Sequence, residues 1–233
     1  MVIYKNKIAG ISGSAVDNAS KGIFITFEGV DGSGKTTQIK LLNKFLKEKG
    51  FNSFITREPG GTALGDSIRK LLLNPENNGP VARAEALLFE AARAELTEKV
   101  IRPALDKGKI VICDRYFDST LAYQGFARGL GIDSLLDLSL WATSGLVPDI
   151  TFLLSLDASD SEKRLDRQSR KRDRIEHEDG DFKKKLQEGY NELAGRFKER
   201  IVLIDANKEI NKIFCDIKLK MLELLISRGW LTQ

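Results

Sequence analysis

The chain has 233 residues, 42% of them hydrophobic and 30% charged, which predicts one sizeable domain with a packed core and a charged surface. Its 37 Lys and Arg against 33 Asp and Glu leave a net charge of +4, too small an excess to predict nucleic-acid binding. The sequence contains no run of about 18 apolar residues, so no membrane-spanning helix is predicted. With two cysteines and a single histidine, neither a disulfide framework nor a zinc site is predicted.

Residues 1–21 differ in composition from the rest of the chain. They are rich in Gly, Ser, Ala and Asn and are interpreted as a flexible extension, whereas residues 22–233 are interpreted as a single domain. The first residues lack a basic stretch followed by an apolar core and a small-residue cleavage site. We therefore expect no secretion signal and a cytoplasmic protein.

Short apolar runs alternate with helical patterns along the domain. The runs predict strands at Ile23–Phe27, Phe51–Ile55, Ile110–Cys113, Ile150–Leu156 and Ile201–Ile204. The helical patterns predict helices at Lys35–Lys49, Thr62–Leu73, Val81–Asp106 (bent or broken by Pro103), Asp133–Thr143, Ser159–Arg170, Asp181–Lys198 and Lys208–Ser227. Strands separated by helices imply right-handed crossovers, so the predicted fold class is α/β, a three-layer structure with a five-stranded parallel sheet and helices on both faces.

A phosphate-binding loop follows the first predicted strand. The pattern G-x-x-x-x-G-K-[ST] is matched in full by Gly29-Val30-Asp31-Gly32-Ser33-Gly34-Lys35-Thr36, between a strand and a helix. The glycines allow backbone conformations that point consecutive N–H groups at phosphate oxygens, and the helix adds its positive dipole end. The pattern therefore predicts ATP binding, with Lys35 at the β- and γ-phosphates and the Thr36 hydroxyl on Mg²⁺.

A second acidic position supports this prediction. The strand Ile110–Cys113 is followed directly by Asp114, and in phosphate-loop enzymes an acid at the end of a strand holds the magnesium ion. The carboxyl ends of the strands of an α/β sheet form the ligand crevice, so Asp114 should face the loop. Taken alone, an Asp after a strand is more often a turn or helix cap. Thr36 and Asp114 are thus the candidate metal ligands.

The acceptor of the phosphoryl group is indicated by arginines. An alcohol acceptor usually needs a general base, whereas a phosphate acceptor is already an anion and needs positive charge beside it. The chain offers Arg57 and Arg115 after strands, Arg93 on the long helix, and six basic residues between Arg164 and Arg174. Arginine suits planar, bidentate phosphate contacts. The chemistry therefore favours a nucleoside monophosphate kinase.

Several segments, in order along the chain, resemble the thymidylate kinases. They are Phe27–Thr37, Thr56–Thr62, Asp114–Tyr116 with Ser119–Gly125, and Asp173–Glu176, and the resemblance runs from about Gly22 to Leu225. The Arg-Glu-Pro-Gly-Gly run at 57–61 is the most specific piece, and the phosphate loop the least. The resemblance implies a P-loop NTPase fold, an Mg²⁺-dependent transfer from ATP to dTMP giving ADP and dTDP, and a homodimer.

The resemblance also implies roles for individual residues. Phe89 would stack on the thymine ring, Arg93 would bind its O4 carbonyl, and Tyr123 would lie where a ribose 2′-hydroxyl would project. Arg57 and Arg115 would hold the acceptor phosphate, and Asp31 would contact the 3′-hydroxyl or the magnesium shell. Further expected contacts are Ser119, Thr120 and Gln124 on the dTMP side and Thr37 and Asn207 on the ATP side. Without the resemblance, Phe89 would be assigned to a core stripe with Ala92 and Leu96.

The chain departs from one branch of the family inside the phosphate loop. Some members carry an arginine just after the acid that matches Asp31, where this chain has Gly32. The missing charge would then come from a mobile, arginine-rich lid at about residues 159–176. Within it, Arg167 and Arg174 are the arginines expected to reach ATP or the transferring group, and a closed lid would exclude water.

Three alternatives remain at this point. The same fold could act on another acceptor, such as dUMP, CMP or a deoxynucleoside. A different class, an ATPase or nucleotide-dependent switch, would need a water-positioning residue and partner surfaces, which the sequence does not identify. A catalytically silent binding protein is disfavoured by intact Lys35, Thr36 and Asp114.

Overall fold

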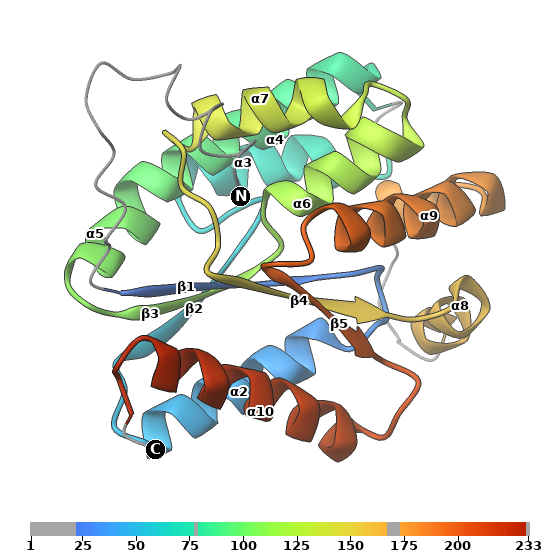
Figure 1. Cartoon of the computed structure of the whole chain (residues 1–233). Helices are drawn as coiled ribbons and strands as arrows, with labels where there is room; N and C mark the ends of the chain where they lie inside the picture. Colours follow the sequence, from blue (N-terminus) through green and yellow to red (C-terminus); the bar gives the residue numbers. More distant parts are fainter. Residues whose placement is uncertain (1–21, 77–78, 167–172, 232–233) are drawn as a thin grey trace.

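The computed structural model describes residues 22–76, 79–166 and 173–231, and within them a five-stranded parallel sheet forms the centre (Figure 1). The strands lie in the order β2 (Ser53–Arg57), β3 (Ile110–Asp114), β1 (Ile23–Glu28), β4 (Ile150–Ser155) and β5 (Ile201–Asp205). The five predicted strands are confirmed with small shifts in their ends. The extension predicted at residues 1–21 lies outside the described residues.

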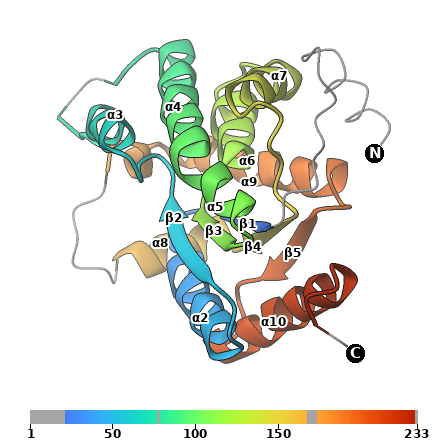
Figure 2. The ribbon, with the colours of Figure 1, turned by 90° about the vertical axis from the view of Figure 1, so that its left-hand side faces the viewer.

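Helices cover both faces of the sheet, which confirms the predicted three-layer α/β fold (Figures 1 and 2). One face carries α2 (Lys35–Glu48) and α10 (Ile210–Ser227). The other face carries α3 (Ala63–Leu73), α4 (Ala82–Leu96), α5 (Arg102–Asp106), α6 (Phe117–Thr120), α7 (Ile132–Ala142) and α9 (Gly180–Arg196). The remaining helical segments, α8 (Ala158–Asp166) and the short turn η3 (Ile175–His177), lie in the predicted lid region.

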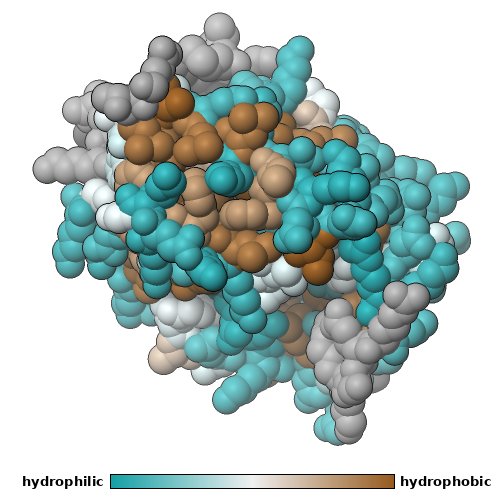
Figure 3. Space-filling view, turned by 90° about the horizontal axis from the view of Figure 1, so that it is seen from below, coloured by the Kyte–Doolittle hydropathy of each residue, from teal (hydrophilic) through white to brown (hydrophobic). Residues whose placement is uncertain are grey.

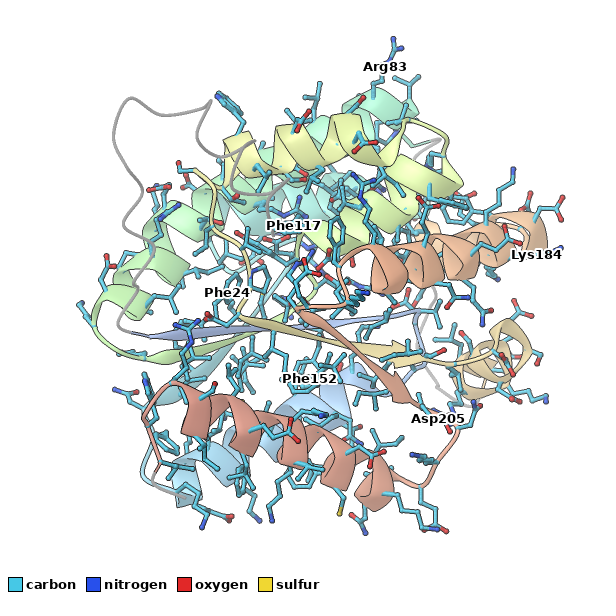
Figure 4. All side chains as sticks on the ribbon, in the orientation of Figure 1. Phe24, Arg83, Phe117, Phe152, Lys184 and Asp205 are labelled. Atoms are coloured by element: carbon cyan, nitrogen blue, oxygen red, sulfur yellow. The ribbon has the colours of Figure 1, made fainter. Side chains whose placement is uncertain are left out.

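The two faces of the sheet hold separate parts of the core. Side chains alternate along a strand, so Phe24 of β1 joins the cluster under the upper helices, whereas Ile25 and Phe27 join the cluster packed against α2 and α10. Figure 4 shows this division, with Phe24 and Phe117 on the upper side of the sheet and Phe152 on the lower side. Burial on both faces explains why the strand sequences are continuous apolar runs.

Two helical segments can be compared with the prediction. The long helix expected from Val81 to Asp106, bent or broken by Pro103, is interrupted by a π-helical turn, η1 (Thr97–Ile101), immediately before the turn that contains Pro103. Proline has no N–H to donate and its ring crowds the preceding turn, so the regular hydrogen-bond ladder cannot continue through it. The other segment, α6 followed by the π-helical η2 (Leu121–Ala127), was not predicted as helix at all. It packs against both α7 and α9, and its nearly complete burial hides the helical period.

The registers of the strands set the position of the functional residues. Both Phe27 of β1 and Arg57 of β2 lie opposite Asp114 of β3. All these strands run parallel, so their carboxyl ends, and the loops that follow them, meet at one edge of the sheet.

Large apolar side chains also remain exposed on the surface. The face formed by α2 and α10 shows an apolar area in Figure 3, and the exposed residues of α10 and β5 include Leu219, Ile226 and Leu203. On the helices of the other face, Leu87 of α4 and Trp141 of α7 are exposed. None of the helices in the described ranges is long and apolar enough to cross a membrane.

Candidate active site

A cavity of about 490 Å³ opens at the carboxyl edge of the sheet. It brings together most of the residues selected from the sequence, namely Asp31, Gly32, Gly34, Lys35, Thr36, Thr37, Arg57, Phe89, Asp114, Arg115, Ser119, Thr120, Tyr123 and Gln124. The selected residues that do not line it are Gly29, Val30, Ser33, Arg93, Arg174 and Asn207. Arg167 lies outside the described residues. Further residues that were not predicted to be site residues also line the cavity, namely Glu58, Pro59, Arg69, Leu73, Asp173, Ile175 and Glu176.

The phosphate loop has the backbone that its glycines allow. Gly32 and Gly34 have φ of 77° and 96°, a region that side chains disfavour, and α2 begins directly after Gly34. Lys35 is only 6% exposed, and its Nζ donates to the carbonyl oxygens of Gly29 and Val30, each at 2.9 Å. Burial, and next the charge of Arg115, lower the pKa of Lys35 to about 8. A polyanionic ligand beside this amine would favour its charged form.

Two oxygen groups at the mouth of the loop form the candidate metal site. The Thr36 hydroxyl donates to Asp114 Oδ2 at 3.3 Å, and both residues line the cavity. A hydroxyl and a carboxylate are oxygen ligands of the kind that Mg²⁺ prefers, and Mg²⁺ commonly takes its other ligands from phosphates and water. The pair therefore fits the predicted metal position.

Arg115 connects the phosphate loop to helices α6 and α9. Its Nη2 donates to Asp31 Oδ1 at 2.8 Å, and its Nη1 lies within hydrogen-bond distance of Gly29 O (3.0 Å), Ser119 Oγ (3.1 Å) and Tyr190 Oη (3.2 Å). Its φ is 71°, in the left-handed region that is uncommon for a residue other than glycine. A strained backbone of this kind often accompanies a functional side chain.

Arg93 occupies a different place from the one expected. Its side chain is 1% exposed and does not reach the cavity lining. Its Nε donates to Glu58 Oε2 at 2.8 Å, its Nη2 to Thr120 Oγ1 at 3.0 Å, and its Nη1 to Glu90. Glu58 and Thr120 do line the cavity, so Arg93 supports two lining residues. Burial raises the pKa of Glu58 to about 8, although Arg93 acts in the opposite direction.

Phe89 lies between the cavity and part of the apolar core. It lines the cavity, and it also packs against a small apolar cluster that contains Ala92, with Ile68 and Leu72 of α3. The same side chain of Phe89 therefore packs in the apolar core and lines the cavity.

Arg69 of α3 is a lining residue that the sequence did not reveal. Its Nη1 donates to Pro59 O at 3.0 Å, and burial, followed by the charge of Arg57, lowers its pKa. Arg57 also lines the cavity, so two guanidinium groups interact there. Arg69 lies between Ile68 and Lys70 in the sequence, and the helical pattern alone does not distinguish it from a solvent-facing arginine.

Glu85 of α4 holds one wall of the site to the segment after α8. This fully buried carboxylate accepts hydrogen bonds from Gln124 (2.7 Å), Arg128 (2.8 Å) and Arg174. Arg174 also donates through Nε to Leu72 O at 2.8 Å. In this conformation Arg174 is bound to α3 and α4 and does not line the cavity, so its predicted contact with the transferring group remains a prediction.

Replacement of Glu85 with Gln is expected to destabilise the fold by about 3 kcal/mol, because it leaves two partly buried guanidinium groups without their shared, fully buried carboxylate. Burial alone would raise the pKa of Glu85, but the hydrogen bonds from Arg128, Gln124 and Arg174 lower it overall. A lowered pKa gives stability above the unfolded-state pKa that is lost as the pH falls. Thermal unfolding should therefore show a Tm difference between the two proteins at pH 7 that shrinks below about pH 4. An equal difference at both pH values would contradict this account.

Helix α8 rests directly on the phosphate loop. The Ser161 hydroxyl donates to Asp31 O at 2.6 Å, and a Cβ at Gly32 would lie 2.9 Å from Ser161 O. Arg164 of the same helix donates to Ala206 O at 2.8 Å in the loop after β5. The neighbouring Asn207 is exposed and bonds Asp205 instead of lining the cavity. Helix α8 is thus fitted to a glycine at position 32.

Introduction of an arginine at this position tests that fit. Gly32→Arg is expected to displace α8 and raise KM for ATP by about tenfold, because the side chain collides with Ser161 and is strained at φ 77°. The matched control is Gly50→Arg, since Gly50 has φ of 84° with no atom within 4 Å of a Cβ. Equal KM values for ATP in the two variants would show that α8 does not depend on Gly32.

Comparison with known proteins settles the family. A family model described as thymidylate kinase matches residues 27–217. The chain belongs to the thymidylate kinase family. A thymidylate kinase of Geobacillus sp. (strain WCH70) is 47% identical over 196 residues, covering 83% of this chain and 93% of that protein. One of Caldanaerobacter subterraneus subsp. tengcongensis is 48% identical over 191 residues, covering 82% and 90%.

A solved structure supports the same conclusion for the fold. The crystal structure of thymidylate kinase from Ehrlichia chaffeensis matches with a TM-score of 0.70 and 36% identity, over 87% of this chain and 98% of that chain. The thymidylate kinase family therefore accounts for the five-stranded sheet, the phosphate loop and the Arg-Glu-Pro-Gly-Gly segment together.

Proposed function

We infer that this chain is a dTMP kinase that transfers the γ-phosphoryl group of ATP to dTMP and yields ADP and dTDP. The observation that carries this conclusion is a single cavity lined by both the phosphate loop and the arginines of the acceptor side. Phosphoryl transfer requires little covalent chemistry from the protein, and depends on positioning and on charge stabilisation. A cavity that holds two phosphate-bearing substrates end to end supplies both the positioning and the charge stabilisation.

We assign the acceptor phosphate to Arg115 and Arg57, with Arg69 as a third cation. Arg115 is bonded to Asp31 of the phosphate loop, and Arg57 and Arg69 line the same cavity. Their charge offsets the repulsion between the phosphates of ATP and dTMP. Lys35 is assigned to the β- and γ-phosphates, where it would exchange its two carbonyl partners for phosphate oxygens.

The nucleoside of dTMP is assigned to the part of the cavity between α4 and the α6–η2 segment. Phe89 supplies an aromatic face, and Thr120 and Gln124 supply polar groups beside it. In this conformation Arg93 is proposed to position Thr120 and Glu58 beside the base. A direct hydrogen bond from Arg93 to the base would require its side chain to move. Tyr123 is proposed to exclude the 2′-hydroxyl, and its Oη lies 3.5 Å from Asp31 Oδ2.

Mg²⁺ is proposed to be held by Thr36 and Asp114 together with the phosphates of ATP. When bound, the ion would neutralise charge on the β- and γ-phosphates as it develops in the transition state. The contribution of this chain is to hold the two oxygen ligands 3.3 Å apart beside the loop.

A homodimer and a cytoplasmic location are proposed from the family. Exposed Leu87 and Trp141 lie on α4 and α7, helices that pack against each other, and a second copy would remove both from water. Sedimentation velocity measurements test this: a single species at the monomer mass across micromolar concentrations would contradict the dimer.

An acceptor panel tests the proposed function and the assignment of the base and sugar pockets. ADP release from ATP and Mg²⁺ is measured with dTMP, dUMP, ribothymidine monophosphate, dCMP or AMP as acceptor. Strong turnover with dTMP and weak turnover with the ribose form are expected. Preference for another monophosphate would retain the mechanism and reject the pocket assignment, and release without an acceptor would indicate an ATPase.

A further inference from the structure

A buried carboxylate lies behind the arginine that faces the acceptor. Glu28 is the last residue of β1 and is 0% exposed. Its Oε1 accepts from the backbone N–H of Tyr116 at 2.8 Å, and its Oε2 accepts from Ser119 Oγ at 2.6 Å and Tyr190 Oη at 3.1 Å. One side chain thus joins the end of β1 to the turn after β3, to α6 and to α9.

The partners of Glu28 are also the partners of Arg115. Ser119 Oγ and Tyr190 Oη lie 3.1 Å and 3.2 Å from Arg115 Nη1, and Tyr116 is the next residue along the chain. Arg115 has φ of 71°, so the turn is not held by local backbone preference and needs outside contacts to persist. Glu28 supplies such a contact through the N–H of Tyr116.

We propose that Glu28, acting through Ser119 and Tyr190, is a positioning residue that fixes the guanidinium of Arg115 for the acceptor phosphate. The ionised carboxylate accepts all three hydrogen bonds, which leaves the Ser119 and Tyr190 oxygens with lone pairs directed towards Arg115. A protonated carboxyl group must itself donate, so at least one of these contacts is disrupted. This inference rests on the proposed function.

The surroundings of Glu28 make its protonation relevant near neutral pH. Burial, and next the charge of Asp118, raise the pKa of Glu28 to about 7, while Arg115 lowers it. The other titratable or charged groups that interact with Glu28 come from the loop, the neighbouring strands and the helices, namely Lys35, Glu58, Cys113, Tyr123 and Tyr190. Positioning by ionised Glu28 should therefore be present above about pH 8 and lost below about pH 6.

The experiment compares wild type with Glu28→Gln, which keeps the size of the side chain and removes its charge. We expect the ratio of their kcat/KM values for dTMP to be about ten at pH 8 and to approach one at pH 6, with KM for ATP changed less than about twofold. The ratio cancels the ionisation of dTMP itself. Glu188→Gln, an exposed Glu-to-Gln change on α9, is the matched control and should behave as wild type at both pH values.

Two results would overturn the proposal. One is a ratio that does not change with pH, and the other is a loss that falls equally on ATP and dTMP, as general damage to the fold would produce. Tyr190→Phe provides a second route if Glu28→Gln does not fold. It removes one hydroxyl between Glu28 and Arg115 and should lower kcat/KM for dTMP about threefold with ATP unaffected; no change for dTMP would contradict the proposal. Absence of dTMP turnover in the wild type would instead reject the proposed function.

Discussion

Replacement of Arg115 with alanine is expected to lower kcat/KM for dTMP by about 1000-fold, the largest effect on the acceptor side. Arg115 bonds both Asp31 of the phosphate loop and Ser119 of α6, and is proposed to hold the acceptor phosphate. Its removal would then leave that phosphate facing the phosphates of ATP without a charge between them. Steady-state kinetics with dTMP varied at saturating ATP measure the effect.

A second substitution distinguishes the effect of the charge of Arg115 from the effect of its planar shape. Arg115→Lys keeps the charge but loses the planar fork, so an intermediate loss of about 30-fold is expected. Arg57→Ala should cost less than Arg115→Ala, because the Arg57 side chain is 60% exposed and its charge is partly screened by water. A larger loss for Arg57→Ala would mean that the acceptor phosphate lies near β2 and not beside Arg115.

Replacement of Lys35 with methionine is the second change with a large expected effect, a fall in kcat of about 1000-fold. Methionine preserves most of the apolar length of the lysine side chain, so the loss measures the ammonium group at the β- and γ-phosphates. The substitution also removes a buried charge, and we expect the variant to unfold at a temperature no lower than the wild type. A loss of activity without a loss of stability identifies Lys35 as catalytic.

The pH dependence of the wild type supplies a check on the same residue. The pKa of Lys35 is lowered to about 8 in the protein without ligands, so its amine loses its proton above that pH. Binding of ATP should become weaker above about pH 8, and the Lys35→Met variant should lack this step. A step of equal size in the variant would assign the titration to another group.

Much of the fold could be predicted because the physical signals were local. Continuous apolar runs such as Ile110–Cys113 identified buried strands, and the full phosphate-loop pattern fixed which end of the sheet carries the site. The α6–η2 segment could not be predicted, because its burial between α7 and α9 makes apolar residues appear on every side. Residues Ser119, Thr120, Tyr123 and Gln124 were nevertheless found, through the motif that they belong to.

Interactions between segments that lie far apart in the sequence could not be predicted from it. Arg93 forms ion pairs with Glu90 and with Glu58, and the pair with Glu58 joins α4 to the loop after β2. The spacing of residues in the sequence does not predict that Arg93 is fully buried. The contact of Arg174 with Glu85 spans 89 positions. The family resemblance implied an arginine-rich lid, but only the fold shows which of the described arginines is bound to Glu85.

Transfer of the label from ATP labelled in its γ-phosphate is the most direct test of the central claim, that one cavity joins ATP to dTMP. The enzyme is incubated with labelled ATP, Mg²⁺ and dTMP, and the products are separated. The label is expected to appear in dTDP, and Arg115→Ala is expected to reduce this transfer. Label that appears in inorganic phosphate at the same rate with and without dTMP would contradict it.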